Sequence, residues 1–250
     1  MMQKDGIDCW GFDPTYEGSN TRVKREYFGS TYGRTYDGFV LRHVLEHVKD
    51  PISFLKLIRD ANNGVGKIYI EVPCFDWIIQ HNTWYDIFYE HVNYFRLDDF
   101  RRMFGTVIEC GRLFGGQYLY VVADLASLRE PVIDENHLLD PKTFVKFDFS
   151  LLKVEQTSQI AIWGGASKGV IFSLMALRNG LDIEYVVDIN PAKQGKFLAA
   201  TGLRVISPEQ AYSLLPLGSN IFVMNSNYLA EIKMMSKNAF NCVCIEDFTN

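Results

Sequence analysis

The sequence predicts an α/β protein built in two parts. Residues 36–123 alternate strand-like runs with helical runs of regularly spaced apolar residues. The stretch 125–159 is mixed, polar and without clear periodicity, and a strand, a Gly-rich turn and a helix then follow from Gln159 to Arg178. An alternation of strands and helices that stops and restarts is typical of two α/β units. We therefore expect three segments: 1–124, a linker at 125–158 with one packed helix near Phe144–Leu152, and 159–250.

Composition and charge exclude several classes of protein. The chain has 250 residues, and its 48% hydrophobic and 14% aromatic content is enough for a core in each part. Its net charge is −5 and no basic stripe is visible, so nucleic acid is not an expected partner. The apolar runs are too short to cross a bilayer and the first ten residues contain no secretory segment. We expect a soluble, cytoplasmic protein without a membrane partner.

Cysteine usage predicts reduced thiols. The chain has five cysteines in no C-x-x-C pair, at Cys9, Cys74, Cys110, Cys242 and Cys244. An odd and scattered set favours neither a disulfide framework nor a zinc site, so we expect no bound metal.

The first part opens with a short strand and a turn at Asp13–Pro14. Tyr36–Val44 alternates and is rich in strand-forming residues, which predicts a strand, and Leu45–His47 follows at its C-terminal end. Asp50 and Pro51 predict the start of a helix, because Asp is a preferred N-cap and Pro is tolerated in the first turn.

Further elements complete the first part. A strand is expected at Lys67–Val72, and helices are expected at Phe75–Phe88 and Leu97–Phe104. Thr106–Cys110 and Gln117–Ala123 are expected to form an antiparallel pair of strands. Ligands of open α/β sheets bind beyond the carboxyl ends of strands. His43 and His47, at the end of the Tyr36–Val44 strand, are therefore candidate site residues.

The second part begins with a β–α–β pattern. The strand Gln159–Trp163 leads into a Gly-rich turn at Gly164–Gly169, and the next strand, Ile183–Val187, ends at Asp188. This resembles a dinucleotide-binding fingerprint, with Ala166 in place of the middle glycine. A helix N-terminus of this kind can hold a phosphate through its free N–H groups, and Lys168 adds charge. Further strands are expected at Arg204–Ile206, Asn220–Met224 and Cys242–Glu246.

An aromatic segment, Trp84–Phe95, contains the most reactive combination of residues. It holds six aromatic side chains, and Tyr89, Glu90 and His91 stand together within it. Aromatic surroundings exclude water and can move the pKa of a histidine or glutamate towards the working pH. The alternative is an aromatic core helix with one satisfied histidine.

Five stretches carry a resemblance to a known family. They are Phe39–Pro51, the strand and turn Ile68–Ile78, Phe88–Phe95, Ile160–Gly169 and Tyr185–Lys196. From about Cys9 to the end, the chain resembles the S-adenosylmethionine-dependent sugar C-methyltransferases, which act on nucleotide-linked keto-sugars. The resemblance implies an incomplete class I methyltransferase (Rossmann-like) domain followed by a second, smaller Rossmann-like α/β domain that faces the substrate. Relatives usually begin with a zinc module and a Gly-rich cofactor loop. We expect an N-terminally truncated chain, or a separate polypeptide that supplies the missing segment.

The resemblance also implies roles for individual residues. His91 is the expected general base, with Tyr89, Glu90 and His47 as its polar surroundings. Asp13, Arg42 and His43 are expected to contact S-adenosylmethionine, with Asp13 on the ribose hydroxyls. The nucleotide-linked sugar is expected at Gln117, Tyr118, Gly164, Gly165, Ser167, Lys168 and Asp188.

Two other functions remain open at this point. A degenerate relative that binds a sugar nucleotide, or acts as a partner subunit, would not bind S-adenosylmethionine in a titration. A nicotinamide-dependent oxidoreductase would use Gly164–Gly169 and Asp188 and would bind NAD.

Overall fold

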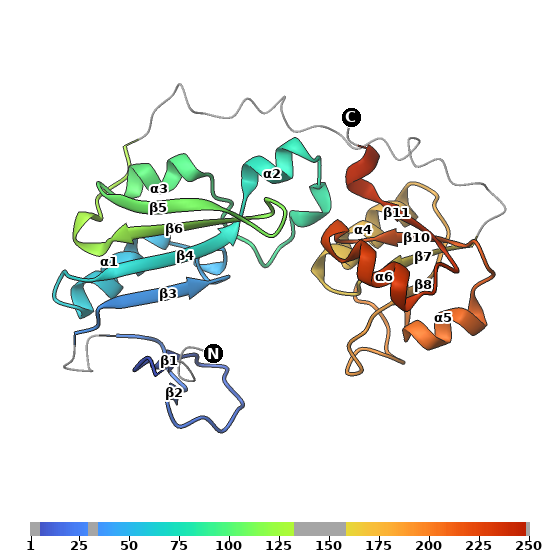
Figure 1. The fold of residues 1–250 in the computed structure, drawn as a ribbon, viewed down its shortest axis with the longest axis horizontal. Helices are drawn as coiled ribbons and strands as arrows, with labels where there is room; N and C mark the ends of the chain where they lie inside the picture. Colours follow the sequence, from blue (N-terminus) through green and yellow to red (C-terminus); the bar gives the residue numbers. More distant parts are fainter. Residues whose placement is uncertain (1–5, 30–34, 133–158, 249–250) are drawn as a thin grey trace.

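The computed structural model describes residues 6–29, 35–132 and 159–248, which form three β-sheets (Figure 1). The mixed α/β fold expected from the sequence is confirmed. Strands β1 (Gly11–Phe12) and β2 (Val23–Lys24) pair in parallel as a separate small sheet. The described residues contain no disulfide and no helix with the length and hydropathy of a membrane span. The helix expected at Phe144–Leu152 lies outside them.

The first large sheet has the strand order β3-β4-β6-β5. Strands β3 (Gly38–Arg42) and β4 (Lys67–Pro73) are parallel, whereas β6 (Tyr118–Asp124) is antiparallel to both β4 and β5 (Val107–Leu113). Helix α1 (Pro51–Ala61) makes the crossover between the parallel pair. The Asp50 side chain accepts a hydrogen bond from Ser53 N at 3.0 Å, which confirms the predicted N-cap.

The core of this sheet follows from the two-residue period of its strands. Ile70 of β4 lies opposite Val121 of β6, and both are buried, as are their neighbours two residues away on each strand. Leu55 and Ile58 of α1 and Phe100 of α3 (Leu97–Met103) are buried in the same core. Fully burying one such side chain contributes about 1.5–3 kcal/mol.

The prediction of one long helix at Phe75–Phe88 is wrong. Helix α2 ends at Gln80, and Asn82 adopts a left-handed conformation with φ of 48°. Asparagine tolerates this conformation, which closes the helix with a hydrogen bond from Thr83 N to Ile78 O at 3.0 Å. A short 3₁₀ turn, η4 (Trp84–Asp86), follows, and no regular helix is assigned from residue 87 to 96. His91 therefore lies on an irregular segment rather than on a helix.

The second large sheet has five parallel strands in the order β11-β10-β7-β8-β9. Their bounds are β7 Ile160–Trp163, β8 Ile183–Val187, β9 Arg204–Ile206, β10 Asn220–Val223 and β11 Asn241–Cys244. Helix α4 (Ser167–Arg178) buries Phe172 and Ala176 against one face. Helices α5 (Pro208–Leu214) and α6 (Leu229–Met235) contribute Ala211 and Ile232 to the other. The strand order reverses between β7 and β10, and such a switch point is where open α/β sheets bind ligands.

The η4 turn joins the two parts. Tyr85 is fully buried in the hydrophobic cluster of the five-stranded sheet, although it follows the four-stranded sheet's α2 in sequence. The rings of Trp84 and Tyr85 lie 5.8 and 6.1 Å from that of Phe172. This packing holds the segment that leads to His91 against α4.

Candidate active site

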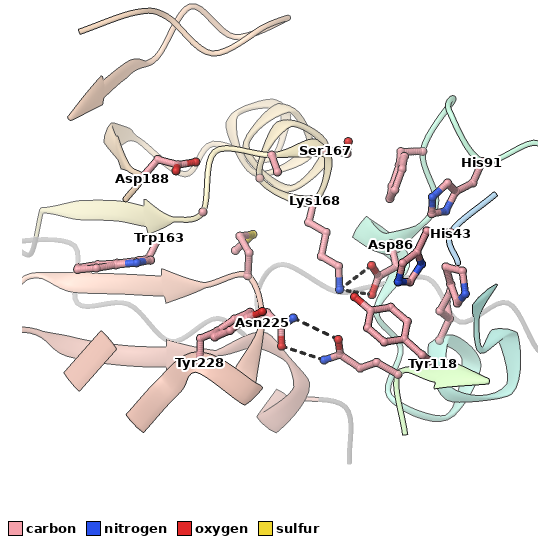
Figure 2. A pocket seen from close by; sticks show the side chains of 18 of the residues that line it. His43, Asp86, His91, Tyr118, Trp163, Ser167, Lys168, Asp188, Asn225 and Tyr228 are labelled. Atoms are coloured by element: carbon pink, nitrogen blue, oxygen red, sulfur yellow. Dashed lines mark hydrogen bonds and ion pairs between the residues drawn. The ribbon is translucent and has the colours of Figure 1, made fainter. Parts of the chain in front are cut away.

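A cavity of about 570 Å³ lies between the two parts, where strands of both large sheets end (Figure 2). The first part lines it with residues that follow β3 and β4 and with the segment around His91. The second part lines it with residues that follow β7, β8 and β10. The lining includes His43, Glu46, His47, Trp77, Asp86, His91, Gln117, Tyr118, Trp163, Gly164, Ser167, Lys168, Asp188, Asn225 and Tyr228.

Polar contacts between the two parts cross this cavity. Lys168 Nζ lies 2.7 and 2.9 Å from the two carboxylate oxygens of Asp86 (Figure 2). Burial raises the pKa of Asp86, and the Lys168 ammonium opposes that effect. The amides of Gln117 and Asn225 exchange two hydrogen bonds at 3.0 and 3.2 Å. These contacts hold α4 and the end of β10 against the first part.

Two short motifs, Leu45–His47 and Tyr89–His91, form one unit, which we call the LEH–YEH cluster. Hydrogen bonds from Val92 N and Asn93 N to Glu46 O, at 2.9 and 3.1 Å, connect the backbones of the two motifs. His47 Nδ1 lies 2.7 Å from Glu90 O. A carbonyl oxygen can only accept, so Nδ1 of His47 carries the proton and Nε2 keeps its lone pair in the neutral ring.

His91 has the environment expected of a general base. Its ring centroid lies 4.1 Å from that of Phe88 and 4.9 Å from that of His47. Burial lowers the pKa of His91 below its usual value, and the nearby Glu46 carboxylate opposes this effect. Its Nδ1 is buried without a hydrogen bond in the described part of the chain. A neutral imidazole that lines a cavity can accept a proton at neutral pH.

Glu46 is the functional candidate that the sequence reasoning missed. It is only 1% exposed, and neither carboxylate oxygen makes a hydrogen bond among the described residues. Its Oε1 lies 3.3 Å from His43 Nδ1, and the other ring nitrogen of His43 lies 3.3 Å from Glu71 Oε1. The close Glu46 carboxylate raises the pKa of His43 against the effect of burial. The signal in the sequence was an acid in an apolar turn at the end of a strand.

The same cluster is the one described group whose ligand atoms approach the spacing of a metal site. One atom each of Glu46, His47 and His91 lies within 4.8 Å of the others. Around a tetrahedral zinc with bonds of about 2.1 Å, ligand atoms stand about 3.4 Å apart. One oxygen of Glu46 also faces His43, at 3.3 Å. We therefore interpret the cluster as acid–base machinery rather than as a metal centre.

The residues predicted to hold S-adenosylmethionine are only partly assembled. His43 lines the cavity, whereas Asp13 and Arg42 do not. Asp13 Oδ1 accepts hydrogen bonds from Thr15 N and Thr15 Oγ1 at 2.8 and 2.7 Å. The Arg42 guanidinium donates to both carboxylate oxygens of Glu71, at 3.1 and 3.2 Å. The cofactor roles of these two residues stay predictions.

Tyr89 and Glu90 also lie away from the cavity lining. Tyr89 is 82% exposed, and its hydroxyl lies 3.3 Å from Glu90 Oε1. Ser167 Oγ donates to Glu90 Oε2 at 2.9 Å, so Glu90 links the YEH motif to the N-terminus of α4. The rings of His47 and His91 lie side by side, and Glu90 has a bridging position.

The predicted substrate residues lie mostly on the cavity wall; of that set, Gly165 alone is not a lining residue. Gly165 N donates to Asp188 Oδ2 at 2.9 Å. Asp188 also accepts from Asn190 N at 2.8 Å and from Lys193 Nζ at 3.1 Å. The Asp188 carboxylate is thus engaged by the protein. The sequence reasoning missed Trp163, Asn225 and Tyr228, which give the second part's wall its aromatic and amide groups.

Comparison with known families agrees with this architecture. Residues 1–107 match the family model of a methyltransferase domain, and residues 148–241 match that of a C-methyltransferase C-terminal domain. A search of curated proteins gave no match. The chain therefore carries a methyltransferase domain and a C-methyltransferase C-terminal domain. By resemblance to these two families, it is an S-adenosylmethionine-dependent C-methyltransferase.

Proposed function

We propose that this protein methylates a carbon next to the ketone of a nucleotide-linked keto-sugar. The observation that carries the proposal is the position of His91, a neutral imidazole on the wall of a cavity shared by both matched domains. Abstraction of a proton next to a ketone requires such a base. The sugar and its nucleotide rest on the motif resemblance together with the features of the cavity given below.

The size and the aromatic lining of the cavity support the binding of S-adenosylmethionine. Its volume of about 570 Å³ is within the usual range for ligand sites. The rings of Trp77 and Tyr118 line its wall. Aromatic faces attract a cation such as a sulfonium. When bound, S-adenosylmethionine supplies the methyl group that is transferred to carbon.

The chain's own residues prepare the sugar carbon. His91 accepts the proton as the C–H bond breaks, and the electron pair moves to the carbonyl oxygen, which becomes an enolate oxygen. Tyr118 is the better donor to that oxygen than His47, whose one proton in the neutral ring is held by the Glu90 carbonyl. Burial raises the pKa of Tyr118, so its hydroxyl stays protonated and can donate. Tyr118 thus takes the role first predicted for Tyr89 and His47.

The Gly-rich turn (Gly164–Gly169) is suited to the phosphates of the substrate. It leads into α4, a helix of twelve residues whose N-terminal N–H groups attract anions. Trp163 and Tyr228 lie on the same wall and offer ring faces for a nucleotide base (Figure 2). In this proposal the segment 159–250 faces the nucleotide, the segment 1–124 faces the methyl donor, and the enzyme works in the cytoplasm.

The oxidoreductase alternative is disfavoured by Asp188. In a dinucleotide site this acid accepts hydrogen bonds from the ribose. Here its two oxygens already accept from Gly165 N, Asn190 N and Lys193 Nζ. A carboxylate has about four acceptor sites, so contact with both ribose hydroxyls would displace one of the hydrogen bonds that hold the Gly-rich turn.

Two measurements on the full chain test the proposal. The first incubates the protein with ¹³C-methyl S-adenosylmethionine and a panel of nucleotide-linked keto-sugars, and follows a new carbon-bound methyl signal by NMR. The second follows exchange of the sugar's α-proton in D₂O without the methyl donor. We expect both activities, and His91→Gln should lower both by roughly 10²–10⁴-fold. Undiminished exchange in this variant would show that His91 is not the base.

A further inference from the structure

We propose that Glu46 is the positioning residue of His91: its buried carboxylate fixes the imidazole with the proton on Nδ1 and balances the charge of the imidazolium. This inference rests on the proposed function, because it assigns a partner to the proposed base. It extends the site by a residue from the other motif of the LEH–YEH cluster.

The Glu46 side chain is buried, and neither of its oxygens makes a hydrogen bond among the described residues. Burying a charged group without hydrogen bonds is unfavourable, so the state of Glu46 calls for a physical explanation. Oε1 faces His43 at 3.3 Å, which leaves Oε2 available.

His91 has an unbonded ring nitrogen that could bind this carboxylate. Its Nδ1 is buried and lacks a hydrogen bond in the described residues. A ring nitrogen of His91 and a carboxylate oxygen of Glu46 lie within 4.8 Å of each other. Hydrogen bonds of catalytic groups are often long before substrate binds and shorten in the complex. A protonated Nδ1 would satisfy both groups and leave Nε2 as the base.

Backbone hydrogen bonds connect the segments that carry Glu46 and His91. The backbone carbonyl of Glu46 accepts from Val92 N and Asn93 N, directly after His91. Asn93 Nδ2 also donates to Val48 O at 2.6 Å. The turn that carries the carboxylate is thus fastened to the segment that carries the imidazole, which limits how far the two can separate.

The other charged and titratable groups around Glu46 and His91 already have partners. His47 is held by the Glu90 carbonyl, and its ring meets that of His91 at 73°. The Glu90 side chain is bonded to Ser167, and the Asp86 side chain to Lys168. His43 stands between Glu46 and Glu71. Glu46 is the buried carboxylate of this group that still has an oxygen to offer.

The chemistry balances with Glu46 remaining ionised. When the sugar C–H bond breaks, its electrons go to the carbonyl oxygen and its proton goes to Nε2 of His91. The Nδ1–H bond stays intact and donates to the Glu46 carboxylate, which stabilises the imidazolium. An acid that orients a histidine in this way and is not itself protonated is known from hydrolases.

NMR of the full chain tests the inference without substrate. Long-range ¹H–¹⁵N spectra of ¹⁵N-histidine protein, assigned with His91→Gln, report the tautomer and the pKa of His91. We expect the Nδ1–H tautomer in the unchanged protein and a lower pKa of His91 in Glu46→Gln. Glu71→Gln is the matched control, because Glu71 lies beyond His43, and it should leave the His91 titration in place. An Nε2–H tautomer in the unchanged protein would overturn the proposal even if no variant folds.

Kinetics then separate a positioning role from a merely structural one. Glu46→Gln should lower α-proton exchange by roughly 10²–10⁴-fold at saturating substrate, with little change in KM. Glu46→Asp should restore part of that loss. If no methyl transfer is found for any sugar, the proposed function fails while the NMR result stands. Stoichiometric zinc in the purified protein that is lost in Glu46→Gln would instead make the cluster a metal centre and refute the inference.

Discussion

The LEH–YEH cluster of the first part and the Gly-rich turn of the second part both lie where strands end at the cavity, yet their polar groups differ. In the cluster, Glu46 and Nδ1 of His91 are buried without hydrogen bonds among the described residues. In the turn, Asp188 accepts from three donors. Burying a polar group without hydrogen bonds is costly, whereas a bonded group such as Asp188 holds a loop in shape. We propose that the first region carries the chemistry and that the second positions the substrate.

The largest expected effect concerns the shape of the Gly-rich turn. A Cβ at Gly169 would stand 2.0 Å from the backbone oxygen of Gly164, which cannot move without opening the turn. We expect Gly169→Ala to lower the free energy of unfolding by about 3 kcal/mol. Urea denaturation followed by circular dichroism measures this. Gly165→Ala is the control within the turn, because its nearest neighbour is a Val186 methyl at 3.1 Å, and it should lose less than about 1 kcal/mol.

The next effect concerns the contact between the two regions. Lys168→Met leaves the Asp86 carboxylate buried without its ammonium, and we expect a loss of about 2–3 kcal/mol at pH 7, since both groups keep some exposure. Burial raises the pKa of Asp86. Removing Lys168 raises it further, so the contribution of Asp86 to the stability of the variant is fully present below the unfolded pKa of about 3.9 and is lost as pH rises through the folded value.

A double variant checks that explanation. Asp86→Asn combined with Lys168→Met removes both charges and should recover most of the stability at pH 7, with a flatter dependence on pH. Urea denaturation at several pH values gives the comparison. A double variant as unstable as Lys168→Met would show that the loss came from packing rather than from the unpaired carboxylate.

The sequence predicted the elements that local patterns decide. Asp is preferred at the N-cap of a helix and Pro in its first turn, and Asp50 and Pro51 take these positions in α1. The aromatic spacing of Phe75–Phe88 is equally compatible with a helix, but the left-handed Asn82 interrupts it. The pairing of Lys168 with Asp86, 82 residues apart, depends on packing between the two parts, which no local pattern encodes. Glu46 was missed for the same reason, because its burial depends on the segment around His91.

A smaller effect tests whether Asp188 is structural. Asp188→Asn keeps the shape of the side chain but removes its charge and replaces one acceptor oxygen by a donor amide. We expect a loss of about 1.5 kcal/mol, because charge-assisted hydrogen bonds from Gly165 N and Lys193 weaken. Thermal unfolding measures it. Isothermal titration with NAD should show no binding to the unchanged protein, and clear binding that is lost in Asp188→Asn would revive the oxidoreductase alternative.

The smallest effect is a pH dependence centred on His43. The Glu46 carboxylate raises the pKa of His43, so its stabilising charge is fully present below the unfolded pKa of about 6.5 and is lost as pH rises through the raised folded value. The His43 side chain is 38% exposed, which keeps the effect below about 1 kcal/mol. Unfolding free energies at pH 6 and pH 8.5 should therefore differ less in His43→Asn than in the unchanged protein. His81→Asn, at a position outside the cavity lining, is the matched control and should keep the original difference. An equal loss in both variants would mean that Glu46 is not the source of the pH dependence.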